Sequence, residues 1–341
     1  MSRAVLIVNF GGPRNLEEIE PFLIELLTDP EVIRPFTPRF FHRMLFKRIA
    51  KKRAKKVRVD YALIGGKSPI YEDTEAIAKK IEEKTGIPTL CFHRYLPMTH
   101  DAFVQKMSHF SAEEILVFPL FPQFSYATTG SIAQWFFDHL PFAVISKMRW
   151  VKSYSTHPAF ITLFCARMKH FLESKKVEEK KTLFLYSAHG LPLEFIHLGD
   201  IYQKECEASF KALSKQFPSA KNILCYQSKF GEAEWLRPST QDLCEEIAER
   251  QKEDISVVFI PLSFTSDHIE TLFEIDTLYL PILEKKGMRA FRCPAIGHAE
   301  QWDSAIVKIL ETADFVSTQM LMRHDVYTNN LKNREYDKET P

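Results

Sequence analysis

The sequence has almost no net charge and no long apolar run, and these absences exclude several classes of protein. Of its 341 residues, 45 are Lys or Arg and 44 are Asp or Glu, which leaves a formal net charge of +1. A general nucleic-acid-binding protein would carry a basic excess, so we expect no nucleic-acid partner. No segment approaches the roughly 18 apolar residues that cross a bilayer. Gly-x-Gly-x-x-Gly and Walker patterns are absent as well, which leaves nucleotide binding with little support.

The six cysteines are scattered and include no Cys-x-x-Cys pair, so we find no zinc or iron–sulfur motif among them. The short apolar run AVLIVNF ends at Gly11-Gly12-Pro13, which predicts a buried strand rather than a signal peptide. In a chain without an export signal the cysteines are expected to be reduced thiols. We therefore expect a cytoplasmic protein.

Short β-branched or aromatic runs alternate with helix-length segments along the chain. This alternation predicts an α/β fold of parallel sheets flanked by helices on both faces. RAVLIVNFGGP at the N-terminus is echoed by KTLFLYSAHGLP at 181–192, which predicts two similar halves that meet at an active-site cleft. The expected strands are Val5–Val8, Thr89–Phe92, Glu114–Phe118, Met148–Val151, Leu183–Tyr186, Asn222–Tyr226, Ser256–Ile260 and Arg289–Arg292.

We expect the first half to span residues 1–152 and the second half 153–297. A C-terminal helix, from about Asp303 to Met322 within residues 298–328, is expected to pack back on the first half. The polar tail 329–341 is predicted to be disordered. The other expected helices are Leu16–Leu27, Tyr71–Thr85, Pro158–Leu172, Tyr202–Gln216, Thr240–Arg250 and Ile269–Glu284.

Acidic side chains gather in PLSFTSDHIETLFEID (261–276), directly after a strand pattern. On an α-helix, Asp267, Glu270 and Glu274 would lie at positions i, i+3 and i+7 of one face. Stacked like charges cost free energy unless something neutralises them, so this face would hold a divalent cation or pass protons. The alternative is structural, with Asp267 as an N-cap and Glu270 as its capping-box partner. Glu274 fits that alternative less well because it lies beyond the first turn.

His189 directly follows a predicted strand in the segment SAHGLP (187–192). An imidazole at this position would point into the cleft, where a pKa near neutrality suits proton abstraction or metal ligation. A surface-loop histidine is the alternative, since the chain has 12 histidines.

Two polar turns are ambiguous. PQFSYATTGS (122–131) offers hydroxyls and amides that would either cap a helix or bind an anionic group. IGGKSPI (64–70), with its Ser68-Pro69 pair, would either contact a ligand or only turn the chain into a helix.

Residues 36–58 combine dense positive charge with an apolar helical stripe. Basic amphipathic helices of this kind commonly lie on anionic membrane surfaces or bind acidic partners. A buried stripe with a solvated basic face is the ordinary alternative, and a large apolar anion with carboxylates at its edge is a further possible ligand. The stripe consists of Phe40, Phe41, Met44, Leu45 and Ile49.

Together these motifs resemble the ferrochelatases, enzymes that insert Fe²⁺ into a porphyrin. The resemblance runs in family order through VNFGGP, IGGKSPIY, HRYLPMT, FPQFSYATTGS, YSAHGLP, YQSKFGEAEWLRPST and PLSFTSDHIETLFEID, and so covers the chain to about residue 315. Each motif is weak alone, but seven in sequence are specific. The resemblance implies a lyase of haem biosynthesis with the chelatase fold, two Rossmann-like halves around the site.

The resemblance also implies roles for single residues. His189 corresponds to the active-site histidine, Glu270 to its partner carboxylate and Glu274 to the next carboxylate along, with Asp267 and His268 in support. The porphyrin must lose two N–H protons while the cation enters, so ring distortion and proton abstraction by His189 are expected. His189 and Glu270 are equally expected as ligands of the incoming Fe²⁺, and the sequence does not decide between base and ligand.

Four further residues are expected in the porphyrin pocket. Arg53 is placed at its lip as a partner for a propionate, Phe10 on the opposite wall, and Ser68 and Tyr126 in the two polar turns. Members that act on coproporphyrin often have Tyr where this chain has Phe10, so the expected substrates are protoporphyrin IX and Fe²⁺, giving protohaem. Insertion into coproporphyrin III is one alternative, and a non-catalytic porphyrin or haem carrier is another.

No permanently bound cofactor is expected, because Fe²⁺ is a substrate. Some family members carry an iron–sulfur cluster on C-terminal cysteines, but no cysteine follows Cys293 here, so no cluster of that kind is expected. The basic segment 36–58 would add peripheral contact with the inner face of a membrane to the cytoplasmic location.

Overall fold

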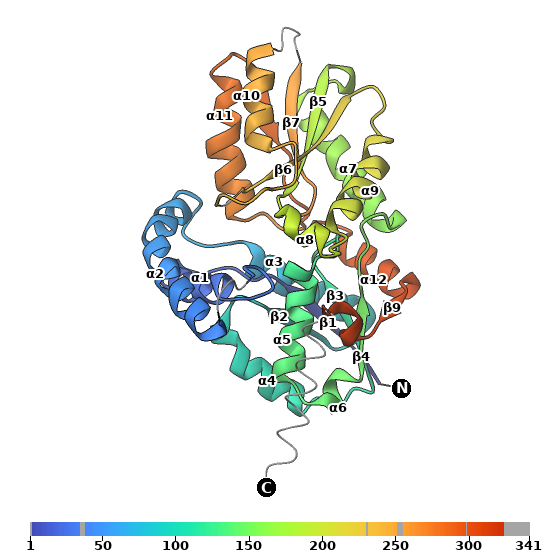
Figure 1. The fold of residues 1–341 in the computed structure, drawn as a ribbon. Coiled ribbons are helices and arrows are strands. Elements are labelled where there is room, and N and C mark those ends of the chain that lie inside the picture. The colour runs from blue at the N-terminus through green and yellow to red at the C-terminus, as the bar shows by residue number, and fades with distance from the viewer. Residues whose placement is uncertain (1, 35–37, 230, 251–254, 298, 324–341) are drawn as a thin grey trace.

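The computed structural model describes residues 2–34, 38–229, 231–250, 255–297 and 299–323. Two sheets form two lobes, one above the other in Figure 1, with the N-terminal lobe below. Neighbouring strands are parallel throughout both sheets except at one edge of the first. This architecture confirms the predicted α/β class.

The first sheet has the strand order β2-β1-β3-β4-β9. Its second strand, β1, is apolar on both faces: Val5 and Ile7 join one buried cluster, whereas Leu6 and Val8 join another. A parallel strand buried in this way needs helices on both sides. Its strands are β1 (Arg3–Asn9), β2 (Thr89–His93), β3 (Glu114–Pro119), β4 (Met148–Val151) and the antiparallel β9 (Phe315–Val316).

The second sheet is fully parallel, with the order β6-β5-β7-β8. Its strands are β5 (Thr182–His189), β6 (Lys221–Gln227), β7 (Ser256–Pro261) and β8 (Arg289–Arg292). All eight strands predicted from the sequence are present. The two-residue β9 was not predicted, because it is too short to give a periodic signal.

Helices cover both sheets (Figure 1). They are α1 (Ile19–Leu27), α2 (Arg39–Leu63), α3 (Ile70–Thr85), α4 (His100–Ser108), α5 (Ser131–His139), α6 (Phe142–Ile145), α7 (Pro158–Lys175), α8 (Leu193–His197), α9 (Tyr202–Ser214), α10 (Thr240–Arg250), α11 (Leu280–Glu284) and α12 (Trp302–Thr312). Two segments are π-helical, η3 (Tyr126–Gly130) and η5 (Glu270–Tyr279). The short 3₁₀ turns are η1 (Leu16–Glu18), η2 (Pro97–Thr99), η4 (Glu179–Lys181) and η6 (Thr318–Leu321).

The C-terminal helix is shorter than expected. It ends at Thr312 rather than Met322, because the backbone becomes extended at Ala313 and then pairs with β4 as β9. The helix contacts α3 of the first lobe and also α7. The predicted disorder of 329–341 falls outside the described residues.

The two lobes share part of their core. One apolar cluster runs from Val5 and Phe118 of the first sheet to Phe184 and Ile260 of the second. Side chains of α7 and α12 lie in the same cluster, so these helices join the sheets. The expected boundary at residues 152–153 falls between β4 and α7.

Candidate functional site

His189 is the last residue of β5, and its backbone is held on both sides. Its N–H donates to the Ser263 hydroxyl at 2.9 Å, and its carbonyl accepts from the Tyr202 hydroxyl at 3.0 Å. The ring Nδ1 contacts the carbonyl oxygen of Gly190. A carbonyl can only accept, so Nδ1 carries a proton and Nε2 is the nitrogen that remains for chemistry.

Glu270 opens the π-helix η5 and lies between two imidazoles. Its Oε1 atom is 3.5 Å from Nε2 of His189, and its Oε2 atom is 3.3 Å from Nε2 of His268. The side chains of His189 and Glu270 are 37% and 26% exposed, so both can be reached by a ligand. The structure therefore brings together the predicted histidine and its predicted carboxylate.

Each member of this pair shifts the pKa of the other so that its charged form is favoured. Burial lowers the pKa of His189, but the charge of Glu270 outweighs it and raises that pKa to about 9. Burial would raise the pKa of Glu270, yet the facing His189 holds it well below its usual range. At neutral pH the resting pair is an imidazolium and a carboxylate.

Glu274 is the third member of the site. Its Oε2 atom accepts a 2.5 Å hydrogen bond from the Ser228 hydroxyl and lies 3.5 Å from the Tyr279 hydroxyl. Burial, together with the charge of Glu270, raises the pKa of Glu274 to about 7. A carboxyl group with this pKa can exchange protons near neutrality, which suits a relay between the pair and solvent.

Asp267 binds partners other than these carboxylates, and its interpretation as an N-cap is wrong. η5 begins at Glu270, its N-cap position is Ile269, and no side chain caps it. The Oδ1 atom of Asp267 instead accepts from Arg292 at 2.7 Å and from the Thr271 hydroxyl at 2.8 Å. Arg292 also binds Asp276, at 2.8 Å. Asp267 thus anchors the start of η5 to β8.

Phe10 and α2 of the first lobe lie close to the start of η5. Phe10 packs edge-on against Tyr95, with ring centroids 4.5 Å apart, and belongs to an apolar cluster that includes Ile269. Arg53 lies on the same helix as Tyr61, and burial lowers the pKa of Arg53. Burial and the charge of Glu270 raise the pKa of Tyr61, which places this phenol near the carboxylate.

Tyr61 is the residue that the sequence analysis missed. It is 2% exposed in a helix whose composition is otherwise strongly basic. Its place three residues before the IGGKSPI turn could have drawn attention to it. Only the contact between α2 and η5, however, shows that Tyr61 belongs to the region of the site.

The two polar turns hold structural contacts. Ser68 is 1% exposed, and a Cβ atom on Gly12 would lie 2.6 Å from its side chain, so Ser68 packs two turns together. Segment 122–131 does bind an anionic group, the carboxylate of Asp200 in the other lobe. Asp200 Oδ2 accepts hydrogen bonds from the Ser125 hydroxyl and the Tyr126 N–H, each at 2.9 Å. The first turn therefore packs within its own lobe, and the second ties the two lobes together.

The predicted apolar stripe of α2 is exposed rather than buried. Phe40 and Phe41 are 73% and 57% exposed, whereas Phe46 and Tyr61 form part of the buried face. Ile49 is half-buried. Residues 36–37 of this segment lie outside the described residues. Among the helices that the structure describes, none is long and apolar enough to cross a membrane.

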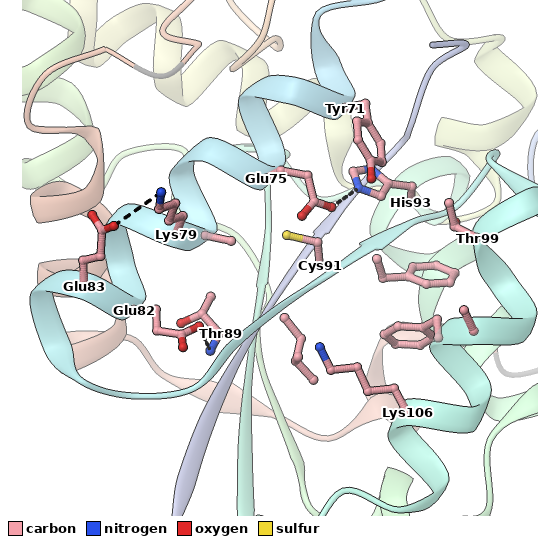
Figure 2. A pocket seen from close by; sticks show the side chains of 15 residues that line it. Tyr71, Glu75, Lys79, Glu82, Glu83, Thr89, Cys91, His93, Thr99 and Lys106 are labelled. Atoms are coloured by element: carbon pink, nitrogen blue, oxygen red, sulfur yellow. Dashed lines mark hydrogen bonds and ion pairs between the residues drawn. The ribbon is translucent and has the colours of Figure 1, made fainter.

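A separate hollow of about 570 Å³ lies at the open edge of β2, between α3 and α4 (Figure 2). Its acidic side chains have partners: Glu75 binds the buried His93 at 3.0 Å, and Glu83 binds Lys79 at 3.7 Å. Glu82 accepts from the Thr89 N–H at 3.1 Å. Within the described chain, no group of three or more His, Cys, Asp or Glu side chains is arranged to hold a metal ion.

Comparison with known proteins bears on this geometry. A family model described as Ferrochelatase matches residues 2–314. Similar curated proteins include the ferrochelatases of Chlamydia caviae, 43% identical over 95% of this chain and 100% of the relative, and of Chlamydia pneumoniae, 42% identical over 94% and 96%. A ferrochelatase of Chlamydia trachomatis serovar D is 41% identical over 90% of this chain and 95% of the relative.

Solved structures support the fold alone. The structure of CbiX, described as the terminal enzyme for biosynthesis of siroheme in denitrifying bacteria, has a TM-score of 0.50, shares 14% identity and covers 91% of this chain and 98% of its own. SirB from Bacillus subtilis with Fe³⁺ has a TM-score of 0.51 at 14% identity, covering 91% and 96%. Both likenesses agree with two chelatase-type lobes.

Proposed function

The chain belongs to the ferrochelatase family and is a lyase that inserts metal into a porphyrin, and from this premise we propose that it inserts Fe²⁺ into protoporphyrin IX to give protohaem. The observation that carries the proposal is the His189–Glu270 pair, 3.5 Å apart and accessible. In this pair, His189 can act as a proton acceptor, and the carboxylate of Glu270 holds the imidazole in position.

The proposed chemistry uses the proton-binding groups in turn. Two N–H protons leave the porphyrin, and a ring distorted by its pocket exposes the nitrogen lone pairs to both base and cation. His189 must be neutral to accept a proton, so the resting imidazolium first gives up its own proton. Glu274, with a pKa raised to about 7, takes it on towards solvent. The approach of Fe²⁺ favours this loss, because a nearby cation lowers the pKa of an imidazole.

An alternative role is ligation of the incoming iron. Imidazole and carboxylate are both suitable ligands for Fe²⁺, so His189 and Glu270 would hold it before insertion. Two ligands form an incomplete site, which suits a cation that passes through rather than one that stays. We also propose that the enzyme works without a resident cofactor, which metal and sulfide analysis of the purified protein tests.

The choice of porphyrin is the finer part of the proposal. Phe10, which packs against Phe22 and Tyr95, presents an apolar ring without a hydroxyl, which favours the less polar porphyrin. Anaerobic incubation with Fe²⁺ and either protoporphyrin IX or coproporphyrin III, followed by absorbance, tests it. A preference for coproporphyrin III overturns the substrate, and binding of both rings without metallation supports a carrier.

Peripheral membrane contact through 36–58 is a further proposal. Exposed apolar side chains at Phe40, Phe41 and Met44 stand next to Arg43 and Lys47 on α2, a combination that suits an anionic lipid surface. Sedimentation with anionic vesicles is expected to retain the wild-type protein and to lose a Phe40→Ser, Phe41→Ser variant. Equal behaviour of the two proteins overturns this contact.

A further inference from the structure

Two consecutive residues at the carboxyl end of β6, Gln227 and Ser228, bind the π-helix η5. The Gln227 Nε2 atom donates a 2.7 Å hydrogen bond to the backbone carbonyl of Glu270 and lies 3.4 Å from Oε2 of Glu274. The Ser228 hydroxyl donates to the same Oε2 atom at 2.5 Å. The two residues therefore contact one acidic residue through its backbone and the other through its carboxylate.

Ser228 makes its contact from an unfavourable backbone conformation. Its φ angle is +66°, in the left-handed region that residues with a side chain rarely adopt. Glycine would make this turn without strain. The turn alone therefore does not account for a serine here, whereas the hydroxyl that reaches Glu274 does.

The side chain and the backbone of Gln227 are also held by hydrogen bonds from residues outside η5. It is 2% exposed, and its Oε1 atom accepts a 2.7 Å hydrogen bond from the Ser187 hydroxyl. Because Oε1 is the acceptor in that bond, the amide group has one orientation, with Nε2 towards η5. The Gln227 carbonyl also accepts from the Gly190 N–H at 2.7 Å. One residue thus ties the turn after His189 to the first carbonyl of η5.

We propose that Gln227 and Ser228 are a positioning pair for metal insertion. Gln227 sets Glu270 against His189, and Ser228 sets Glu274 beside Glu270. Both act through the acidic residues and touch no reacting atom in this assignment. The inference rests on the proposed function, because it concerns the same site. This role explains why Gln227 and Ser228 both donate hydrogen bonds to η5. A π-helix is an uncommon geometry, often found at functional sites, and hydrogen bonds from a neighbouring strand help to hold it.

Ser228→Gly and Ser228→Ala separate the hydroxyl from the backbone. Both variants lose the bond to Glu274, but glycine relieves the left-handed conformation and alanine keeps it. We expect both to lower kcat for porphyrin metallation about tenfold, the size of one hydrogen bond to a charged group, with KM for porphyrin unchanged. We expect the Tm of the glycine variant to equal or exceed that of the wild type.

Gln227→Met and a control complete the design. Methionine keeps the length of Gln227 but donates no hydrogen bond, so amide exchange in residues 270–279 is expected to accelerate while the Kd for porphyrin, from fluorescence quenching, stays within twofold. Ser214→Ala removes a hydroxyl on α9 whose bond is a 3.5 Å contact with its own helix, and it should leave kcat unchanged.

The outcomes separate this inference from the proposed function. Wild-type kcat in both Ser228 variants overturns the positioning pair, as does a loss of kcat matched by an equal loss of porphyrin affinity. Unchanged exchange in Gln227→Met overturns the part given to Gln227. A wild-type protein that metallates no porphyrin overturns the proposed function instead, and the exchange measurement still reports whether Gln227 holds η5.

Discussion

The Nε2 atom of His189 lies 3.5 Å from Oε1 of Glu270, and each group shifts the pKa of the other in the direction that favours a charge on both. The histidine comes from the end of β5 and the glutamate from the start of η5. The second oxygen of Glu270 contacts His268 at 3.3 Å, so one carboxylate serves two imidazoles. A change at Glu270 is therefore expected to alter the protonation of His189.

Replacing His189 by alanine is expected to remove metallation while porphyrin still binds. General acid–base groups commonly contribute about 10²- to 10⁴-fold to rate, so kcat should fall by that factor. Porphyrin affinity should persist, because the apolar wall at Phe10 is untouched. Anaerobic absorbance assays and fluorescence quenching measure the two effects. His170→Ala, an exposed histidine on α7, is the matched control; near-normal turnover in His189→Ala would contradict the role given to His189.

Replacing Glu270 by glutamine is expected to lower the pKa of His189. The carboxylate raises that pKa from 6.5 to about 9 against the effect of burial, and without it burial dominates. A raised pKa in the folded state stabilises the protein fully below pH 6.5, and the stabilisation is lost as pH rises through about 9. The variant should lose this pH dependence.

Histidine NMR titration and thermal unfolding on both sides of this window provide the measurement. Glu245→Gln, on the exposed face of α10, is a control that removes the same charge elsewhere. A His189 titration that is identical in wild type and Glu270→Gln would show that the pair does not form in solution.

The strands could be predicted from the sequence because apolar runs are local. The His189–Glu270 pairing was predicted only through the resemblance of the motifs to the ferrochelatases. The sequence did not show that Asp267 binds Arg292, because Arg292 lies 25 residues further along the chain, at the end of β8. Segment 122–131 offered donors for an anion, but only the fold shows that Asp200 is that anion. Partners distant in sequence leave no local pattern.

Replacing Glu274 by glutamine is expected to change how activity depends on pH. The pKa of Glu274 is raised to about 7, so in the wild type its proton-accepting form appears as pH rises through that value. kcat should therefore rise across neutrality in the wild type, and the variant should lack this rise and be slower above it. Steady-state rates across the pH range measure both. Asp276→Asn, on the same helix but bound to Arg292, should keep the wild-type profile.

Replacing Arg292 by methionine is expected to destabilise the fold more than it slows the chemistry. The arginine is 12% exposed and binds Asp267 and Asp276, so its loss leaves two carboxylates without their cation. We expect a loss of about 2–3 kcal/mol in the free energy of unfolding, less than for a fully buried pair because Asp276 is 35% exposed.

Urea unfolding measures that loss, and kcat of the folded fraction at low temperature should stay within a few-fold of the wild type. Asp267→Asn is the milder companion: it keeps the shape, weakens one contact to Arg292 and should cost about 1 kcal/mol. An Arg292→Met protein of wild-type stability would show that Asp267 does not need this anchor. An Arg292→Met protein that is stable but inactive would show that Arg292 takes part in the chemistry at the start of η5, rather than only holding η5 in place.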